Sequence, residues 1–369
     1  MAAPTPRRSA DPQLLRLSPA TVCVIKPSAL GDVANAFPTL NALRSRWPDA
    51  RITWLINKNL RGLVDRHPQI DDVIEYDRGT AKFGPRGLRY VSRLLRELRG
   101  RRFELTIDLQ GLLRSGVMTA ATGSPVRVGL ADAREGATWF YTHRVVPPGT
   151  RDDAHAVDRL LAVAEAFGAD ISEPRSLVAI SEADREWARR TLADVPRPRL
   201  GVNLGARWET KRWPPAHFAE VVRKAVDLRG AGLFAVGAPE DRPFVEEMIG
   251  RLAPTPVVNV AGRTTLPQLA ALAEEADVFL SNDTGPLHLA VAAGARVVGV
   301  YTCTDPVANG PYGPLALSVK SGVWCAGSYH VNCPRKLECM SELGPDRVWP
   351  LVIEQIDRAG AFGTGSTAA

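Results

Sequence analysis

The stretch that decides the fold is "DVFLSNDTGPLHLAVAAGARVVGVY", residues 277–301. An apolar segment ends in Ser-Asn-Asp, a Gly-Pro pair opens a longer apolar segment, and a second short apolar run, "RVVGVY", follows. Short runs of β-branched residues are typical of buried strands, and Pro is favoured in the first turn of a helix. The stretch therefore predicts a strand–helix–strand unit with parallel strands.

The same alternation extends backwards from this stretch to about residue 197. Apolar runs predict strands in "LGVNLG", "AGLFAVG" and "VVNVAG", and helical periodicity predicts helices in "PPAHFAEVVRKAVDLRG", "PFVEEMIGRLA" and "TLPQLAALAEEA". Regular strand–helix alternation is typical of a doubly wound parallel sheet. We expect a domain over residues 196–345, followed by a helix over 346–360 that packs near the domain junction.

The N-terminal half shows the same alternation. Residues 20–57 predict a strand, a loop, a helix and a second strand, and "IDDVIEYD" and "ELTIDLQG" predict further strands around the helix "RGLRYVSRLLRELRGR". A Pro/Arg linker follows at residues 195–199. We expect a disordered leader over residues 1–20 and a first domain over residues 21–195. The predicted class is α/β, with two Rossmann-like doubly wound domains facing a cleft and ligands bound beyond the carboxyl ends of the strands.

Composition restricts the class of protein further. The chain has 369 residues, 45% of them hydrophobic, and a formal net charge of +6. This mild basic bias is compatible with an anionic substrate, a membrane surface or nucleic acid. The N-terminus lacks the apolar region of a secretory signal, and no run reaches the roughly 20 apolar residues that span a bilayer. These features predict a cytoplasmic protein.

Five cysteines leave the redox chemistry open. Cys23 lies in an apolar run and is expected in the core, whereas Cys303, Cys325, Cys333 and Cys339 come late in the chain. None forms a Cys-x-x-Cys pair, so we expect reduced thiols, with a structural metal site or a labile disulfide as the alternative.

The loop after "DVFLSN" is the first candidate binding element. Asp283 or Thr284 is placed to cap the following helix, and the amides of Thr284 and Gly285 are placed to hold an anion at the helix N-terminus. His288 lies one turn further along. The alternative interpretation is a capped helix with a buried histidine.

Three more strand-end loops fall at the same edge of this domain. Arg207, Lys211 and Arg212 place three cations in "ARWETKR", which suits a diphosphate, although a solvated basic loop is the alternative. Acidic residues often bind ribose hydroxyls, and the small residues of the next loop leave room for a nucleoside. The candidates for these nucleoside contacts are Glu240 or Asp241 and, in the next loop, Gly262 and Thr264.

The first loop of the chain, "KPSALGDVANAFP", offers a candidate general base. We expect Gly31 to let the backbone turn tightly and Asp32 to begin the helix. Asp32 is either a base at the domain cleft or a carboxylate that stabilises the helix dipole. The chain has neither Gly-x-Gly-x-x-Gly nor Gly-x₄-Gly-Lys-[Ser/Thr], which argues against an NAD enzyme and a P-loop NTPase.

Taken together, "IKPSALGDVANAFPTLNALR", "KRWP" and "SNDTGPLHLAVAAGARVVGVY" resemble glycosyltransferase family 9, the ADP-heptose:lipopolysaccharide heptosyltransferases. The likeness extends over about residues 22–349, and "DLQGLLRSG" and "HAVDRLLAVAEAFG" look most like heptosyltransferase I. The resemblance implies the GT-B fold. It also implies an inverting enzyme that transfers heptose from ADP-heptose to a Kdo-type acceptor of the lipopolysaccharide inner core.

The same resemblance assigns roles to individual residues. Asp32 would be the catalytic base, and Lys211 would neutralise charge on the departing ADP. It implies a donor site of Asp283, Thr284, Gly285, His288, Glu240, Gly262, Thr264 and Arg207, and an acceptor site of Arg114, Arg134, Arg78 and Gly31.

The resemblance implies no cofactor and no catalytic metal, and the chain has no Asp-x-Asp motif for a divalent ion. It implies a lipid-anchored glycan acceptor and a peripheral position at the inner leaflet, where the basic segment "RGLRYVSRLLRELRGRR" would face anionic headgroups. We expect no nucleic-acid partner, and the oligomeric state stays open. The alternatives are the same fold with another nucleotide sugar or glycan acceptor, and a non-catalytic binding protein.

Overall fold

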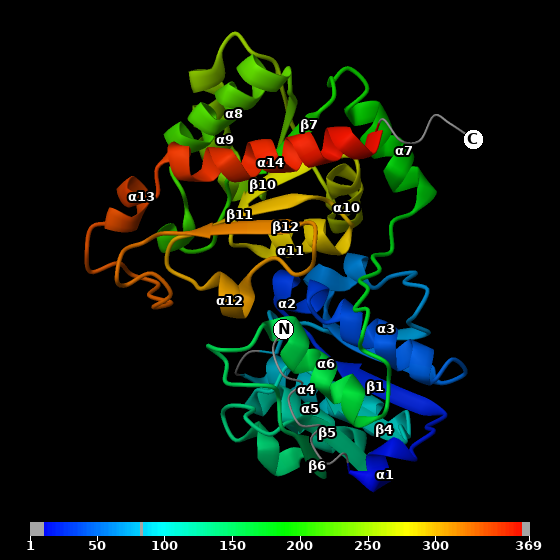
Figure 1. Ribbon diagram of the computed structural model, residues 1–369. Helices are drawn as coiled ribbons and strands as arrows, with labels where there is room; N and C mark the ends of the chain where they lie inside the picture. The colour runs from blue at the N-terminus through cyan, green and yellow to red at the C-terminus, as the bar shows by residue number, and fades with distance from the viewer. Residues whose placement is uncertain (1–10, 82–83, 364–369) are drawn as a thin grey trace. The chain divides into compact units, whose positions relative to one another are not determined.

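The computed structural model describes residues 11–81 and 84–363, and side chains as far as residue 360. The chain forms two compact units, unit 1 (Met1–Ala179) and unit 2 (Ile180–Ala369) (Figure 1). Each unit has a six-stranded sheet in which all paired neighbours are parallel, with helices packed against it. The predicted α/β class, with two Rossmann-like doubly wound sheets, is confirmed.

Unit 1 has the strand order β3-β2-β1-β4-β5-β6. Because β1 pairs with both β2 and β4, the strand order reverses at β1, and the loops after β1 and β4 diverge there. Ligands of doubly wound sheets bind at such a point. The strands are β1 (Thr21–Ile25), β2 (Arg51–Asn57), β3 (Asp72–Tyr76), β4 (Leu105–Asp108), β5 (Val126–Leu130) and β6 (His143–Val145).

The helices of unit 1 pack in pairs, α3 against α6 and α4 against α5. Apolar residues of the strands and of α4 bury each other in the core, as Ile25 and Leu98 do. The helices are α1 (Pro12–Leu15), α2 (Leu30–Ala34), α3 (Phe37–Arg46), α4 (Pro85–Gly100), α5 (Leu113–Thr122) and α6 (Ala156–Ala166), with 3₁₀ turns η1 (Lys58–Leu63) and η2 (Ala137–Phe140).

Unit 2 has the strand order β12-β11-β10-β7-β8-β9. Here the order reverses at β7, which pairs with β8 on one side and β10 on the other. The loops that follow β7 and β10 are therefore the expected ligand loops. The strands are β7 (Arg199–Asn203), β8 (Gly232–Val236), β9 (Val257–Asn259), β10 (Val278–Asn282), β11 (Val297–Tyr301) and β12 (Ala316–Lys320).

The helices of unit 2 surround a larger core, in which α14 packs against α8 and three strands. Helix α10 packs against α7 and α11. The helices are α7 (Glu182–Thr191), α8 (Pro215–Arg229), α9 (Arg242–Leu252), α10 (Leu266–Glu274), α11 (Gly285–Ala292), α12 (Pro306–Asn309), α13 (Glu338–Glu342) and α14 (Pro345–Gly363), with 3₁₀ turns η3 (Glu209–Lys211) and η4 (Pro239–Asp241).

Three predicted boundaries differ from the structure. The leader over residues 1–20 is not disordered throughout, because Asp11 caps α1 and Leu14 is buried; residues 1–10 lie outside the described residues. The units divide after Ala179 rather than at residues 195/196, because α7 packs against α10 of unit 2. The last helix extends to Gly363 and packs against α8 and the sheet of unit 2.

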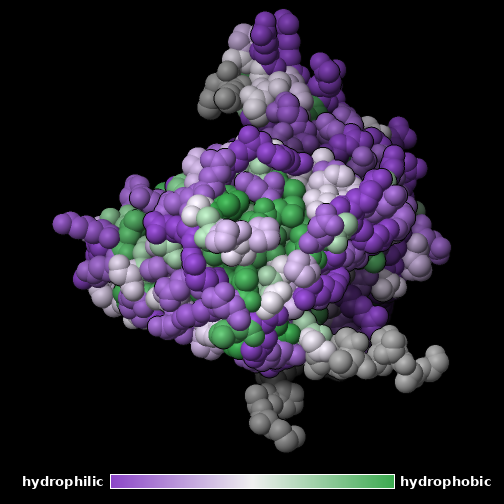
Figure 2. Space-filling view, turned by 90° about the horizontal axis from the view of Figure 1, so that it is seen from above, coloured by the Kyte–Doolittle hydropathy of each residue, from purple (hydrophilic) through white to green (hydrophobic). Residues whose placement is uncertain are grey.

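Polar residues cover most of the face seen in Figure 2, with apolar residues showing between them. Within the described parts of the chain, no helix combines the length and the apolar character needed to cross a bilayer.

Candidate active site

Two buried asparagines tie the β7 and β10 loops of unit 2 together. The Asn203 side-chain amide donates to Thr284 Oγ1 and to Ser281 Oγ, both at 3.0 Å. Asn282 accepts from the amide of Trp213 at 3.1 Å and donates to the Leu204 carbonyl at 2.8 Å. Buried hydrogen bonds of this kind hold both loops in fixed positions. Sequence reasoning missed both asparagines, because their partners are distant in the chain.

Asp283 is the centre of the site that these loops form. Its Oδ2 lies 2.6 Å from Lys211 Nζ and accepts the Thr304 hydroxyl at 2.6 Å. Its Oδ1 lies 3.5 Å from His288 Nε2. Asp283 is 4% exposed; Lys211 supplies the opposite charge, and Thr304 and His288 are neighbouring hydrogen-bonding groups. The predicted catalytic residue Lys211 and the predicted donor residue His288 thus both lie against Asp283, another predicted donor residue.

The pKa of Asp283 follows from this environment. Burial acts to raise it, but the hydrogen bond from His288 and the charge of Lys211 outweigh burial and hold the pKa well below its ordinary value. Asp283 is therefore an anion at neutral pH. Two donors occupy Oδ2, whereas only His288 approaches Oδ1 among the described residues, so the carboxylate acts as a hydrogen-bond acceptor with capacity left on Oδ1.

Lys211 is held from several sides. Its Nζ lies 4.9 Å from the centre of the Trp208 ring, within the range of a cation–π contact. The preceding residue, Thr210, is buried; its carbonyl accepts the Thr302 hydroxyl at 2.6 Å and its hydroxyl accepts the Cys303 thiol at 3.3 Å. The ammonium group is therefore positioned before any ligand arrives, as electrostatic catalysis requires.

The N-terminus of α11 adds backbone donors beside this pair. Thr284 is the N-cap residue, with extended backbone (φ −148°, ψ 169°), but it makes no side-chain cap hydrogen bond. The predicted side-chain cap is wrong, because the Thr284 hydroxyl accepts from Asn203 instead. The Gly285 amide lies in the first turn, where a helix offers no acceptor, so it stays available to an anion.

The predicted nucleoside contacts lie on the β8 and β9 loops. Glu240 is exposed on η4, whereas Asp241 is half-buried and accepts the Ala238 amide at 2.8 Å. The Gly262 amide donates to the Gly237 carbonyl at 2.7 Å and so joins the two loops. Gly262 has φ +68°, and a Cβ there would come within 2.8 Å of Pro239, so glycine is required. Of the other two candidates, Thr264 is half-buried and Arg207 is exposed.

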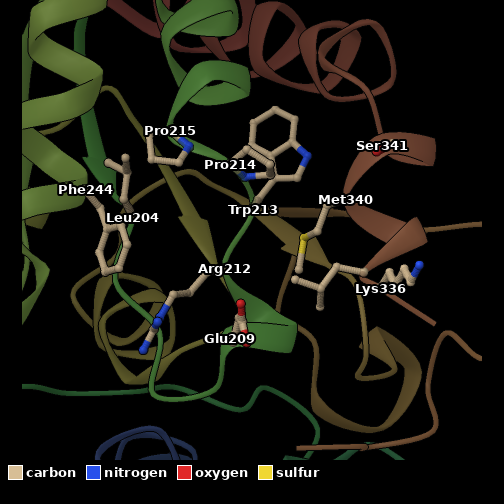
Figure 3. Close-up of a pocket in the computed structure, with 11 residues that line it drawn as sticks. Leu204, Glu209, Arg212, Trp213, Pro214, Pro215, Phe244, Lys336, Met340 and Ser341 are labelled. Atoms are coloured by element: carbon tan, nitrogen blue, oxygen red, sulfur yellow. The ribbon is translucent and has the colours of Figure 1, made fainter. Parts of the chain in front are cut away.

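A cavity of about 320 Å³ lies next to this site but is separate from it. Figure 3 shows Leu204 and Phe244 on one side of it and Lys336 and Met340 on the other. Arg212 lines the cavity; its guanidinium lies 5.1 Å from the Phe244 ring centre, and its Nε donates to the Ala206 carbonyl at 2.7 Å. Arg212 therefore braces the loop. Neither Lys211 nor Asp283 lines this cavity.

In unit 1, the candidate base Asp32 lies in the first turn of α2 with an exposed side chain. Its Oδ2 accepts the Ala29 amide at 2.9 Å, which leaves the other carboxylate oxygen without a described partner. The loop is fixed by Ser28, whose amide donates to Gln110 Oε1 at 3.3 Å. Gly31 lies inside α2, so the predicted tight turn at that residue is wrong.

Two of the three predicted acceptor arginines, Arg114 and Arg134, lie on backbone segments joined by a hydrogen bond. Arg114 lies in the first turn of α5, and its Nε is buried without a hydrogen-bond partner among the described residues. The backbone amide of Arg134 donates to the carbonyl of Gly111, just before α5, at 2.8 Å, so Arg134 lies beside the same loop. Arg78 is exposed after the edge strand β3, and no described contact joins it to the other two.

Buried Asp108 supports the loop that carries Arg114, and sequence reasoning missed it. It accepts the Tyr141 hydroxyl at 2.7 Å and the backbone amides of Gln110 and Gly111 at 2.9 and 3.0 Å. Burial nevertheless raises the pKa of Asp108 above its ordinary value.

All five cysteines are unpaired thiols in the structure. Cys333 Sγ accepts the amides of Arg335 and Leu337 at 3.4 and 3.3 Å, and burial raises the pKa of Cys339 to about 11. Across residues 11–81 and 84–363, no group of three or more His, Cys, Asp or Glu side chains is arranged to hold a metal ion.

Two solved structures of known proteins have a similar fold. The crystal structure of a family 9 glycosyl transferase from Veillonella parvula matches with a TM-score of 0.82 at 22% identity, covering 93% of this chain and 99% of that one. Escherichia coli heptosyltransferase WaaC with ADP matches with a TM-score of 0.72 at 21% identity, covering 91% and 99%.

Relatives by sequence cover most of the chain as well. Lipopolysaccharide core heptosyltransferase OpsX of Haemophilus influenzae is 28% identical over 300 residues, covering 81% of this chain and 83% of its own. Lipopolysaccharide heptosyltransferase 1 of Pseudomonas aeruginosa is 28% identical over 352 residues, covering 89% and 95%.

The two doubly wound sheets and these structural matches define the architecture as the GT-B fold. The model of glycosyltransferase family 9 (heptosyltransferase) matches residues 91–338, which is more than half of the chain. The chain therefore belongs to glycosyltransferase family 9.

Proposed function

We propose that the protein transfers heptose from ADP-heptose to a Kdo-type acceptor of the lipopolysaccharide inner core, with inversion at the anomeric carbon. The observation that carries this proposal is the Lys211–Asp283 pair at the strand-order reversal of unit 2, beside the N-terminus of α11. A cation and backbone donors at one point suit a diphosphate, and a held carboxylate suits sugar hydroxyls. The ADP complex of WaaC supports ADP as the nucleotide.

In this proposal the donor is bound by unit 2. Lys211 and the Gly285 amide bind the diphosphate, and Asp283 accepts hydrogen bonds from heptose hydroxyls. His288 orients Asp283, as its 3.5 Å approach indicates. Around the nucleoside we place Glu240 at the ribose, Gly262 and Thr264 near the base, and Arg207 and Thr284 at the phosphates.

The chemical step needs a base on the acceptor side. Asp32 accepts the proton of the acceptor hydroxyl while that oxygen attacks the anomeric carbon and ADP departs. Lys211 stabilises the negative charge that develops on the ADP oxygen, a task that a bound cation performs in other transferases, so we expect no catalytic metal. The exposed carboxylate of Asp32, with one oxygen unpartnered among the described residues, suits this role.

The acceptor carries carboxylate and phosphate groups, which require cations. Arg114, with its buried and unpartnered Nε, and Arg134 beside the same loop are the better placed candidates, and Gly31 adjoins Asp32. Arg78 is a candidate for an outer phosphate. A guanidinium binds such groups with two parallel hydrogen bonds.

The proposal is tested by incubating the protein with ADP-heptose and a Kdo-terminated acceptor. We expect ADP release together with an acceptor heavier by one heptose. Sugar transfer from a UDP- or GDP-sugar with none from ADP-heptose would show another donor. Nucleotide binding without any transfer would show a non-catalytic binding protein.

We also propose that the protein works in the cytoplasm at the inner leaflet, docked through the arginine-rich face of α4 (Arg86, Arg89, Arg93, Arg96 and Arg99). All five are exposed, and among the residues that the structure describes none forms an ion pair. Leu88, on the same helix, is 70% exposed. Exposed arginines and an exposed apolar side chain on one helix suit an anionic lipid surface.

We expect the protein to sediment with anionic phospholipid vesicles at low salt and to be released at high salt. The double variant Arg89→Gln/Arg93→Gln should weaken vesicle binding about thirtyfold, because each arginine contributes roughly 1 kcal/mol at such a surface. The matched control is Arg189→Gln/Arg190→Gln on α7, whose arginines already pair with Glu182 and Glu186. Equal weakening by both variants would refute docking through α4.

A further inference from the structure

We propose that Thr304 is a positioning residue for heptose transfer, which holds Asp283 so that Lys211 stays available to the donor diphosphate. The inference rests on the proposed function and adds to it a residue that the motifs of the sequence did not indicate. It depends on one arrangement: Thr304 and Lys211 share the same oxygen of a buried carboxylate.

The geometry of this contact leaves little freedom. Thr304 follows β11, the strand paired with β10, and is 1% exposed. Its hydroxyl lies 2.6 Å from Asp283 Oδ2, the oxygen that also lies 2.6 Å from Lys211 Nζ. An ionised carboxylate only accepts hydrogen bonds, so the threonine hydroxyl must be the donor.

Neighbouring contacts fix the Thr304 backbone. On one side, the Cys303 carbonyl accepts the Tyr329 amide at 2.8 Å. On the other side, Asp305 accepts the Val307 amide at 2.9 Å and pairs with Lys320 at 2.6 Å. The hydroxyl is thus directed at Asp283 from a braced loop, which is what a positioning residue requires.

The shared oxygen has a consequence for Lys211. The Thr304 hydroxyl and the Lys211 ammonium both donate to Oδ2. Because the hydroxyl satisfies part of the carboxylate's hydrogen-bonding capacity, the ammonium can donate to a diphosphate at small cost. If the hydroxyl is removed, Lys211 is the one donor left on that oxygen among the described residues, and the buried anion retains it more strongly. Lys211 contacts the diphosphate before and during transfer, but the loss should be largest when charge develops on the leaving ADP, and therefore larger in kcat than in donor KM.

The test compares three single variants in the ADP-release assay. Thr304→Val keeps the shape and removes the donor, and we expect kcat to fall about tenfold while donor KM changes less than twofold. Thr304→Ser keeps the donor and should restore most of the activity. The control is Thr39→Val, at a buried threonine of α3 whose hydroxyl has no partner among the described residues; it should leave kcat unchanged.

A double variant separates positioning from a purely structural role. In a Lys211→Met background, Thr304→Val should cause no further loss of residual turnover, because the residue it acts through is already gone. Melting temperatures check that each variant folds, and Thr304→Ala replaces Thr304→Val if the latter does not.

Two results would overturn this inference alone, provided that the wild type is active. One is a Thr304→Val variant whose turnover equals that of the wild type. The other is a full tenfold loss when Thr304→Val is added to Lys211→Met. A wild type that transfers no heptose overturns the proposed function and this inference with it.

Discussion

Asp32→Asn is expected to lower the turnover of heptose transfer by roughly 10²–10⁴-fold, the range for loss of a general base. An amide has nearly the shape of a carboxylate, and its oxygen can still accept the Ala29 amide that Asp32 accepts at 2.9 Å. The local fold of α2 should therefore persist. What is lost is the ability to take a proton from the acceptor hydroxyl.

The measurement pairs steady-state kcat with ADP affinity from calorimetry. ADP affinity should be unchanged, because the proposed donor residues all belong to unit 2. Asp346→Asn is the matched control: it removes a carboxylate whose side chain is 89% exposed from the first turn of α14, and it should leave turnover intact. Turnover of Asp32→Asn within twofold of wild type would exclude Asp32 as the base.

Lys211→Met is expected to give the second largest loss, roughly 10²–10³-fold in kcat, the range for removing one preorganised electrostatic contact. Unlike Asp32→Asn, it should also weaken ADP binding, since the ammonium is proposed to contact the diphosphate before and during transfer. Equal kcat and ADP affinity in the variant and the wild type would contradict the role of Lys211.

The same variant should lose folding stability. Lys211 and Asp283 lie 2.6 Å apart with side chains 19% and 6% exposed, so removing the cation leaves a buried anion whose remaining partners among the described residues are Thr304 and His288. We expect the free energy of unfolding to fall by about 2–3 kcal/mol, below the full cost for a completely buried pair. Lys211→Met/Asp283→Asn should recover most of that stability, measured by urea unfolding, without recovering turnover.

The pH dependence of stability has a definite sign. The folded-state pKa of Asp283 is depressed, so its contribution to stability is present at neutral pH and is lost as acid protonates the carboxylate. Without the charge of Lys211 the pKa rises. The difference between its folded-state and unfolded-state pKa values therefore narrows, so acid should remove less stability from Lys211→Met than from the wild type, as urea unfolding at neutral and acid pH would show.

The overall fold was predictable because strand and helix periodicity alternate cleanly in both halves. Buried parallel strands are continuous apolar runs, and β7, β8, β10 and β11 show this plainly in the sequence. The strands β5, β6 and β12 were not predicted, because "VRVGL", "HRV" and "ALSVK" mix polar with apolar residues. Helix α1, of four residues, is fixed by a cap rather than by periodicity.

The candidate site was predictable only in part, for a physical reason. Strand-end loops of a parallel sheet share one edge, which is why Lys211 and Asp283 were both candidates. That the two form an ion pair depends on side-chain directions, which no local pattern encodes. Asn203, Asn282 and Thr304 act on residues of other loops, so nothing around them in the sequence marks their roles.

The most direct test of the central claim is the stoichiometry of the purified protein acting on ADP-heptose and a Kdo-terminated acceptor. Released ADP and heptosylated acceptor are followed together, by nucleotide chromatography and by mass spectrometry. The account predicts one ADP for each heptose added, and no product when UDP- or GDP-linked sugars replace the donor. ADP release without heptosylated acceptor, or transfer from the other nucleotide sugars alone, would contradict it.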